Sequence, residues 1–167
     1  FKKTNNLYTL YYFKHLLKDD TIISFADIIV EINIIRKLAK SDKNITALID
    51  TSAIRMGTMR VVLKKKILNY IGNYQSYRAH GNFIGLLKIK KKTIKSFKSS
   101  MNKILEFNEQ RYYTEALNYL IFKKFKINTL DIKKNFWTEI DTPLDYKKAK
   151  NDYKKLVKLD RKYLKKK

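Results

Sequence analysis

Three acidic side chains have the type and spacing to hold a divalent cation, in a chain with only 15 Asp and Glu against 38 Lys and Arg. Glu139 and Asp141 lie two residues apart, so in an extended backbone both side chains point to the same face. Asp27 follows the mostly apolar run IISFA, and in open α/β sheets ligands bind beyond the carboxyl ends of the strands. Because Mg²⁺ prefers carboxylate oxygens, the pattern indicates a magnesium site made of Asp27, Glu139 and Asp141.

Both acidic sites also have a simpler interpretation. Asp27 could be an ordinary loop or capping residue, and Asp141 precedes Thr142-Pro143, where a helix begins with Asp or Thr as its cap. A cap accounts for Asp141 but not for Glu139. The two interpretations differ in geometry. A shared ion requires the Asp27 and Asp141 carboxylates to lie within about 8 Å of each other at neighbouring strand ends, whereas a cap and a loop residue need not meet.

Other side chains are candidates for holding a substrate. Trp137, the only Trp, could line a substrate pocket against a cationic head group, or fill the space under the last helix. Tyr77 and Arg78 precede Gly81 in a loop and could reach a substrate phosphate. His80 is more readily explained as a loop residue than as a base. None of these side chains identifies a reaction by itself.

Segments of helical and strand character alternate along the chain, which predicts an α/β layer sandwich with a mostly parallel sheet. Residues 1–160 form one domain in this interpretation, and residues 161–167 form a basic tail. The expected helices are 4–20, 32–40, 93–107, 112–124 and 144–159, and the expected strands are 21–31, 43–50, 58–63, 67–71, 81–89 and 126–132.

The composition excludes several classes of protein. There is no Cys, which excludes disulfide scaffolds, zinc ribbons and thiol catalysis, and two His are too few for a His-rich metal site. No apolar run approaches the roughly 18 residues of a membrane span. The start FKKTNNLYTL lacks the apolar centre of a signal peptide. We therefore expect a cytoplasmic protein without a membrane span.

The net charge of +23 raises the alternative of a non-enzymatic basic protein that binds nucleic acid. The basic residues are 32 Lys but only 6 Arg, however, and Arg is the residue that recognises phosphate and guanine through two parallel hydrogen bonds. Lys, Ile and Asn make up 65 of the 167 residues, and all three are specified by A/T-rich codons. We attribute most of the charge to this bias and do not expect nucleic acid as a partner.

Five segments resemble, in order, segments of one enzyme family. WTEIDTPLDYKKAK (137–150) resembles the W-x-E-I-D-T-P-E-D-x-x-x-A segment that closes many nucleotidyltransferase domains, and IISFADIIVE (22–31) resembles their I-I-x-x-(G/S)-D-I-x-x-E segment. GNFIGLLKI (81–89) resembles the G-E-F-I-G-L-x-K strand of one branch. TNNLYTLYY (4–12) and RYYTEALNYLIFKKFKINTLDI (111–132) resemble that branch's T-N-N-x-Y-S-L and Y-x-T-D-x-L-x-x-L segments. The branch is the phosphocholine- and phosphonate-type cytidylyltransferases, modules often joined to phosphoenolpyruvate mutase.

The resemblance implies a Rossmann-like nucleotidyltransferase sandwich. The implied reaction transfers a nucleotidyl group from an NTP, usually CTP, to a small phosphate or phosphonate acceptor and releases pyrophosphate. Asp27, Glu139 and Asp141 are then the Mg²⁺ ligands, and Asn82 stands near the acceptor where the family has Glu. Sugar-1-phosphate nucleotidyltransferases share the fold and the acidic sites, and they remain an alternative.

One departure from the family is large. The family's Gly-rich A-A-G-x-G-x-R loop and the P-K that follows it bind the triphosphate and supply a basic residue, and they have no counterpart here. The four Gly residues are scattered and form no phosphate-binding loop. The resemblance therefore implies the C-terminal part of such an enzyme, with the Gly-rich loop and its Lys upstream, and this piece alone is expected to be inactive.

Overall fold

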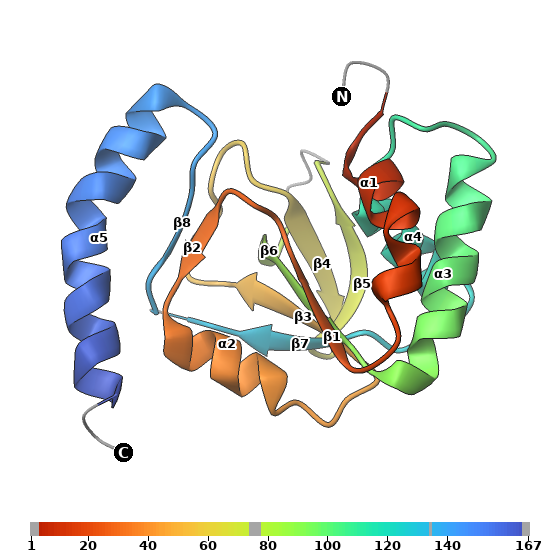
Figure 1. Ribbon diagram of the computed structural model, residues 1–167, viewed down its shortest axis with the longest axis horizontal. Coiled ribbons are helices and arrows are strands. Elements are labelled where there is room, and N and C mark those ends of the chain that lie inside the picture. The colour runs from red at the N-terminus through yellow and green to blue at the C-terminus, as the bar shows by residue number, and fades with distance from the viewer. Residues whose placement is uncertain (1–3, 74–77, 134, 165–167) are drawn as a thin grey trace.

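The computed structural model describes residues 4–73, 78–133 and 135–164. Its centre is a six-stranded sheet, and a separate two-stranded ribbon pairs β2 (Ile28–Val30) with β8 (Trp137–Glu139). The strands of the sheet are β1 (Thr21–Ser24), β3 (Ile45–Asp50), β4 (Arg60–Lys64), β5 (Ile67–Gly72), β6 (Gly81–Ile89) and β7 (Asn128–Asp131). Their order across the sheet is β1-β6-β3-β7-β5-β4 (Figure 1).

The α/β class is confirmed, but the expectation of a mostly parallel sheet is wrong. Among the described pairings of the sheet only β3 with β7 is parallel, and the others are antiparallel. Parallel neighbours need long crossover connections, whereas β4 and β5 are joined directly at Lys65 and Lys66. The φ angles of these two residues, 50° and 63°, suit a tight hairpin turn. Because β6 also pairs with β4, the sheet is mixed and partly closed.

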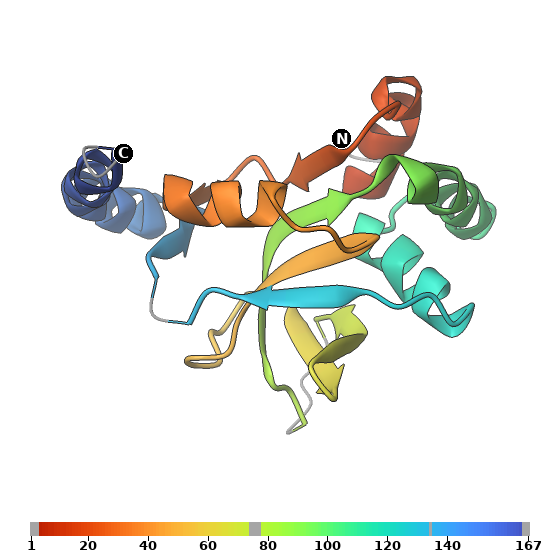
Figure 2. The same cartoon turned by 90° about the horizontal axis from the view of Figure 1, so that it is seen from below.

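Helices lie on both faces of the sheet and produce two hydrophobic cores. Three helices, α1 (Asn6–Tyr12), α3 (Lys91–Leu105) and α4 (Tyr113–Phe122), cover one face, and α2 (Ile32–Ala39) packs on the other near the ribbon (Figures 1 and 2). All nine residues of β6 are buried, as expected for a strand covered on both faces. The side chains of β6 alternate between the cores, so this strand ties the two layers together.

The expected strand 21–31 is divided into β1 and β2 by a turn at residues 25–27. Gly85 makes room for this turn, because it has a φ of +80° and a Cβ there would lie 2.5 Å from the Phe25 ring. The Phe25 N–H donates to the Gly85 carbonyl (3.0 Å), and the Phe25 ring packs edge-on against Tyr113 and Phe83. The chain therefore leaves the main sheet after β1, turns at Phe25, and enters the ribbon at Ile28.

The first and last expected helices also differ from those in the structure. The segment expected as one helix over residues 4–20 forms α1 and a short 3-10 helix, Lys14–Leu16. The last helix, α5 (Pro143–Leu164), continues through residues 161–164, which the sequence assigned to a basic tail. No helix within the described part of the chain is long and apolar enough to span a membrane.

Candidate metal centre

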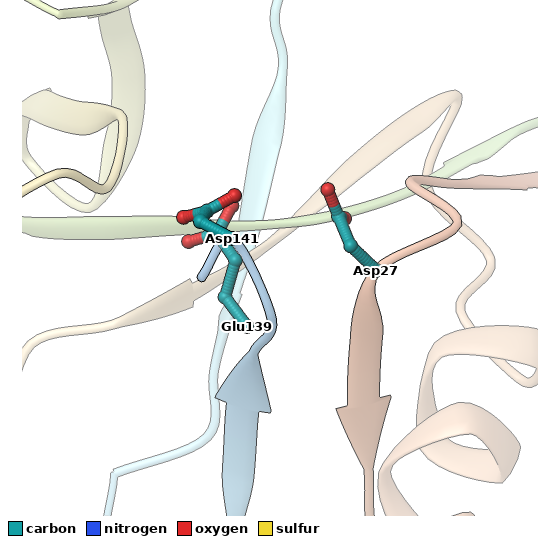
Figure 3. Close-up of side chains that lie close together, drawn as sticks. All are labelled: Asp27, Glu139 and Asp141. Carbon is teal, nitrogen blue, oxygen red and sulfur yellow. The ribbon is translucent and has the colours of Figure 1, made fainter. Parts of the chain in front are cut away.

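The pairing of β2 with β8 brings together acidic residues that are more than 100 positions apart in the sequence. The two strands are antiparallel, with Ile28 opposite Glu139, and the Ile140 N–H donates to the Asp27 carbonyl at 3.0 Å. Asp27 therefore lies beside the stretch 139–141. Figure 3 shows the carboxylates of Glu139 and Asp141 side by side, with Asp27 across from them on the neighbouring segment.

One carboxylate oxygen from each of the three residues lies within 4.8 Å of the others. This confirms the expected proximity of Asp27 and Asp141. The expected place of Asp27 is wrong, because it lies at the amino end of β2 and not at the carboxyl end of a strand. In an antiparallel ribbon, the start of one strand meets the end of its partner, so the cluster still forms.

Asp141 does not cap the last helix. The Asp145 N–H donates to Thr142 Oγ1 at 3.2 Å, and the Thr142 N–H donates back to Asp145 Oδ2 at 2.9 Å. This reciprocal pair is a capping box, with Thr142 as the cap and Asp145 three residues later. Neither bond uses the Asp141 carboxylate, so the cap does not explain why an acid stands there.

Mutual repulsion and burial make the cluster costly without a counter-charge. Burial raises the pKa of Glu139, and the charges of Asp141 and Asp27 raise it further. The pKa of Asp141 is also raised, first by burial and then by the charge of Asp27. A hydrogen bond from Thr58 Oγ1 to Glu139 Oε2 (3.2 Å) and the charge of Arg55 oppose the rise at Glu139. Three carboxylates held this close are an arrangement that a divalent cation would stabilise.

The side chains present fit a Mg²⁺ ion. All three offer carboxylate oxygens, which are the hard donors that Mg²⁺ takes. Asp27 Oδ1 is buried and has no hydrogen-bond partner among the residues that the structure describes. A buried acceptor without a donor is unfavourable by itself, so this oxygen is available to coordinate a cation.

The carboxylates lie between two cavities. The first, of about 680 Å³, is lined by Glu139, Asp141, Arg55, Trp137 and Lys148, among others. The second, of about 580 Å³, shares Glu139 and Asp141 and adds Asp27. Its other walls are uncharged, with amide and aromatic side chains from α1, the turn before β2 and the start of α4, namely Asn5, Asn6, Phe13, Phe25, Tyr112 and Tyr113.

The four residues expected to bind the acceptor do not share one place in the structure. Trp137 lines the first cavity but is only 2% exposed, and its indole N–H donates to Asp50 Oδ2 at 2.7 Å. Asn82 is fully buried, where its side-chain oxygen accepts from the Arg55 N–H at 2.9 Å. Any effect of Asn82 on an acceptor would therefore pass through the segment that carries Arg55. Arg78 is exposed and is not among the residues lining either cavity, and Tyr77 lies outside the described residues.

Sequence reasoning missed Arg55 and Thr58. Both lie in the loop TSAIRMGTM (51–59) between β3 and β4, where no motif stands out. The available signal was the scarcity of Arg in a chain rich in Lys, together with the position of Arg55 shortly after a buried strand. Ligand-binding side chains are often carried on such loops.

Comparisons with solved structures show the fold. The chain is similar to the inositol-1-phosphate CTP transferase from T. maritima, with a TM-score of 0.72 and 17% identity, over 86% of this chain and 58% of that one. It is also similar to a CTP:phosphocholine cytidylyltransferase from Streptococcus pneumoniae, with a TM-score of 0.67 and 19% identity over 90% and 64% of the two chains. For a putative glucose-1-phosphate thymidylyltransferase from Bacillus anthracis, the TM-score is 0.67 and the identity 11%, over 89% and 61%.

These likenesses, all below 20% identity, concern the fold alone. The protein shares the α/β fold of these structures, and it spans about 60% of their length. No protein-family model and no curated protein sequence matches the chain.

Proposed function

We propose that the chain is part of a Mg²⁺-dependent nucleotidyltransferase that transfers a cytidylyl group from CTP to a small phosphate or phosphonate acceptor and releases pyrophosphate. The observation that carries the proposal is the cluster of Asp27, Glu139 and Asp141, with one oxygen of each within 4.8 Å and a buried, unpaired oxygen on Asp27. The nucleotidyltransferase fold supports the same reaction class.

The proposed roles follow from the chemistry of the side chains. Asp27, Glu139 and Asp141 hold the ion, and Thr58 keeps the Glu139 carboxylate in place through its hydroxyl. Bound there, Mg²⁺ supplies the positive charge that offsets negative charge developing on phosphate oxygens during in-line displacement at the α-phosphorus. The carboxylates must be ionised to bind, so their raised pKa values make the metal affinity depend on pH.

The two cavities suit a reaction between two substrates. Glu139 and Asp141 line both, so ligands in the two cavities would approach the same ion from different sides. Bringing two reactants to one metal in a fixed orientation converts an encounter in solution into a step within one complex. The first cavity has cationic side chains from Arg55 and Lys148 as well as four carboxylates, from Glu139, Asp141, Asp145 and Asp152. An anionic group would therefore bind on the side of the two cations, with the ion offsetting the charge of the carboxylates.

The choice of cytidylyl transfer rests on the sequence segments shared with cytidylyltransferases and on the likeness to two CTP-using enzymes. The likeness to a thymidylyltransferase structure keeps a sugar-1-phosphate acceptor as the second candidate. The two candidates share the metal centre and differ in the nucleobase and the acceptor. A binding experiment with both ligand sets therefore separates them.

Paramagnetic resonance of Mn²⁺, used as a probe for Mg²⁺, tests the proposal. We expect one Mn²⁺ to bind per chain, Mg²⁺ to displace it, and the Asp27→Asn variant to bind it at least about tenfold more weakly. The matched control is Asp42→Asn, at an exposed Asp paired with Lys43 away from the cluster, and its affinity should be unchanged.

The bound Mn²⁺ then reports which ligands reach it. Under the proposal, phosphocholine produces a ³¹P coupling at the bound ion that is absent in Asp27→Asn. A coupling produced by glucose-1-phosphate, but not by phosphocholine, would favour the second candidate. Equal Mn²⁺ affinity in the wild type and in Asp27→Asn would remove the metal centre.

A further inference from the structure

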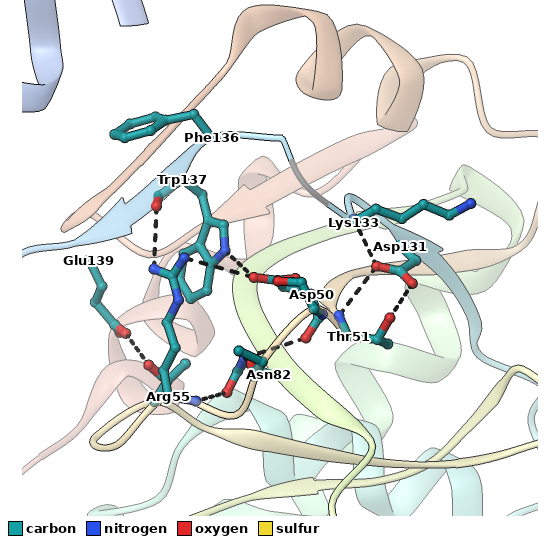
Figure 4. A network of polar contacts seen from close by, with 12 residues as sticks. Asp50, Thr51, Arg55, Asn82, Asp131, Lys133, Phe136, Trp137 and Glu139 are labelled. Carbon is teal, nitrogen blue, oxygen red and sulfur yellow. Dashed lines mark hydrogen bonds and ion pairs between the residues drawn. The ribbon is translucent and has the colours of Figure 1, made fainter. Parts of the chain in front are cut away.

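The guanidinium of Arg55 is held in a defined position on the wall of the first cavity. Its carbon lies 4.0 Å from the centre of the Trp137 ring, and its Nη1 donates to the Trp137 carbonyl at 3.4 Å. Nη2 lies 3.8 Å from Asp50 Oδ2. Figure 4 shows the side chain spread over the indole, between Asp50 and Glu139. Contacts on an aromatic face and to two acceptors restrict a side chain that otherwise has many rotamers.

The residues behind Arg55 are themselves fixed. Asp50 is 1% exposed, and its carboxylate accepts from the Trp137 indole (2.7 Å) and from the N–H and hydroxyl of Ser52 (2.9 and 2.6 Å). The Arg55 backbone N–H donates to Asn82 Oδ1, and Asn82 Nδ2 donates to the Ala53 carbonyl. A buried carboxylate and a buried amide therefore position both ends of this residue.

These contacts leave Arg55 able to bind a ligand. A guanidinium has five N–H donors, and the contacts described for its nitrogens, to the Trp137 carbonyl and to Asp50, engage two of them. The side chain is 42% exposed and lines the cavity that also contains Glu139 and Asp141. Its separation of 3.8 Å from Asp50 is longer than the 2.7–2.9 Å of a strong charge-assisted hydrogen bond. Arg55 can therefore balance the charge of Asp50 and still offer N–H donors to a ligand.

We propose that Arg55 binds the phosphate or phosphonate group of the acceptor in the first cavity, and that Asp50, Trp137 and Asn82 position it for that purpose. The proposal rests on the function proposed above and names the residue that selects an anionic acceptor. A planar guanidinium can give a phosphate two parallel hydrogen bonds, which fixes the orientation of the group as well as its place. A phosphate bound to Arg55 would share this cavity with the carboxylates of Glu139 and Asp141.

The position of Arg55 also bears on the expected role of Trp137. One face of the indole is covered by the guanidinium, and the residue is 2% exposed. Trp137 therefore acts in this proposal as the platform under Arg55, and a cationic head group would have to be held elsewhere. Because it is the only Trp in the chain, its fluorescence reports directly on the occupancy of Arg55.

The test titrates inorganic phosphate and phosphocholine into the full chain in the presence of Mg²⁺, followed by Trp137 fluorescence and by calorimetry. We expect saturable binding that Arg55→Gln weakens about tenfold or more, because two charge-assisted hydrogen bonds are lost. Arg55→Lys keeps the charge opposite Asp50 but loses the planar fork, so its affinity should fall to an intermediate value. The matched control is Arg111→Gln, at a partly exposed Arg paired with Glu115, which should bind phosphate like the wild type.

The outcomes separate this inference from the proposed function. If Arg55→Gln binds phosphate as tightly as the wild type, or if Arg111→Gln weakens binding equally, Arg55 is not the anion site and the inference fails. If Arg55→Gln does not fold, Arg55→Lys decides: unchanged phosphate affinity overturns the inference, and a several-fold loss supports it.

Mn²⁺ affinity is measured on the same variants. Loss of the phosphate site with an intact, Asp27-dependent metal site supports both proposals. If Mn²⁺ affinity does not depend on Asp27 but phosphate affinity does depend on Arg55, only the proposed function is overturned.

Discussion

Replacing Asp27 by Asn should stabilise the metal-free protein and reduce the stabilisation that Mg²⁺ gives. The variant keeps the shape of the side chain and the Asp27 carbonyl that accepts from Ile140. It removes one negative charge from a cluster whose oxygens lie within 4.8 Å of one another. Within the described part of the chain, Asp27 Oδ1 has no hydrogen-bond partner to lose. The change is therefore close to a pure test of charge.

Coulomb's law sets the size of the effect. At 4.8 Å, the repulsion between two unit charges is about 0.9 kcal/mol with the dielectric constant of water and about 3.5 kcal/mol with an effective value of about 20. Asp141 is exposed, so screening favours the lower end. We expect Asp27→Asn to raise the free energy of unfolding by about 1 kcal/mol in EDTA, or the melting temperature by about 2–4 °C.

Mg²⁺ should reverse the order of stabilities. A ligand that binds only the folded state adds about 2.7 kcal/mol at a concentration of about one hundred times Kd. At the same concentration, a variant that binds Mg²⁺ tenfold more weakly gains about 1.4 kcal/mol. The wild type therefore gains at least about 1.3 kcal/mol more than Asp27→Asn, which offsets the advantage of about 1 kcal/mol that the variant has in EDTA. Urea unfolding in EDTA measures the effect of the removed charge, and urea unfolding in excess Mg²⁺ measures the stabilisation by the ion. Asp42→Asn is the control that should show no reversal. If Asp27→Asn is less stable in EDTA, or if Mg²⁺ stabilises it as much as the wild type, the metal-site reasoning is refuted.

Three further predictions concern pH, the turn before β2, and activity. Because the folded-state pKa values of Glu139 and Asp141 are raised, the metal-free protein should lose stability as pH rises above the ordinary carboxyl range, about 4. Mg²⁺ affinity should increase in the same direction, since the ionised carboxylates bind the ion. Urea unfolding and Mn²⁺ titrations at several pH values check both signs. Gly85→Ala should destabilise the protein by about 2 kcal/mol or more, because the new Cβ would lie 2.5 Å from the Phe25 ring at a φ of +80°. Because Phe25 precedes Asp27 in the same turn, Mn²⁺ binding should weaken as well. An unchanged urea midpoint would contradict the packing described for Phe25. Assayed alone with CTP, Mg²⁺ and phosphocholine, the chain should release no pyrophosphate above background, because it has no Gly-rich loop to hold the triphosphate; robust release would show that the nucleotide site is complete without one.

Local patterns in the sequence predicted much of the fold. The strand 81–89 matches β6 at both ends, and the hairpin around Lys64–Lys66 forms β4 and β5 with shifts of one or two residues. These elements were predictable because apolar runs and turn residues act over a few positions. The direction of neighbouring strands was not, since it depends on where distant segments pair. The antiparallel pairing of β6 with β1, β3 and β4 is of this kind.

The candidate site divides in the same way. The sequence by itself determined which acids could serve, because acid is scarce and the i, i+2 spacing of Glu139 and Asp141 places both on one face. It did not determine that Asp27 would meet them, since that depends on the register of Ile28 opposite Glu139. Arg55 depended on the tertiary structure even more strongly. Its position comes from Asp50, Asn82 and Trp137, which lie on three different strands, and no short-range pattern encodes contacts between side chains that only the folded sheet brings together.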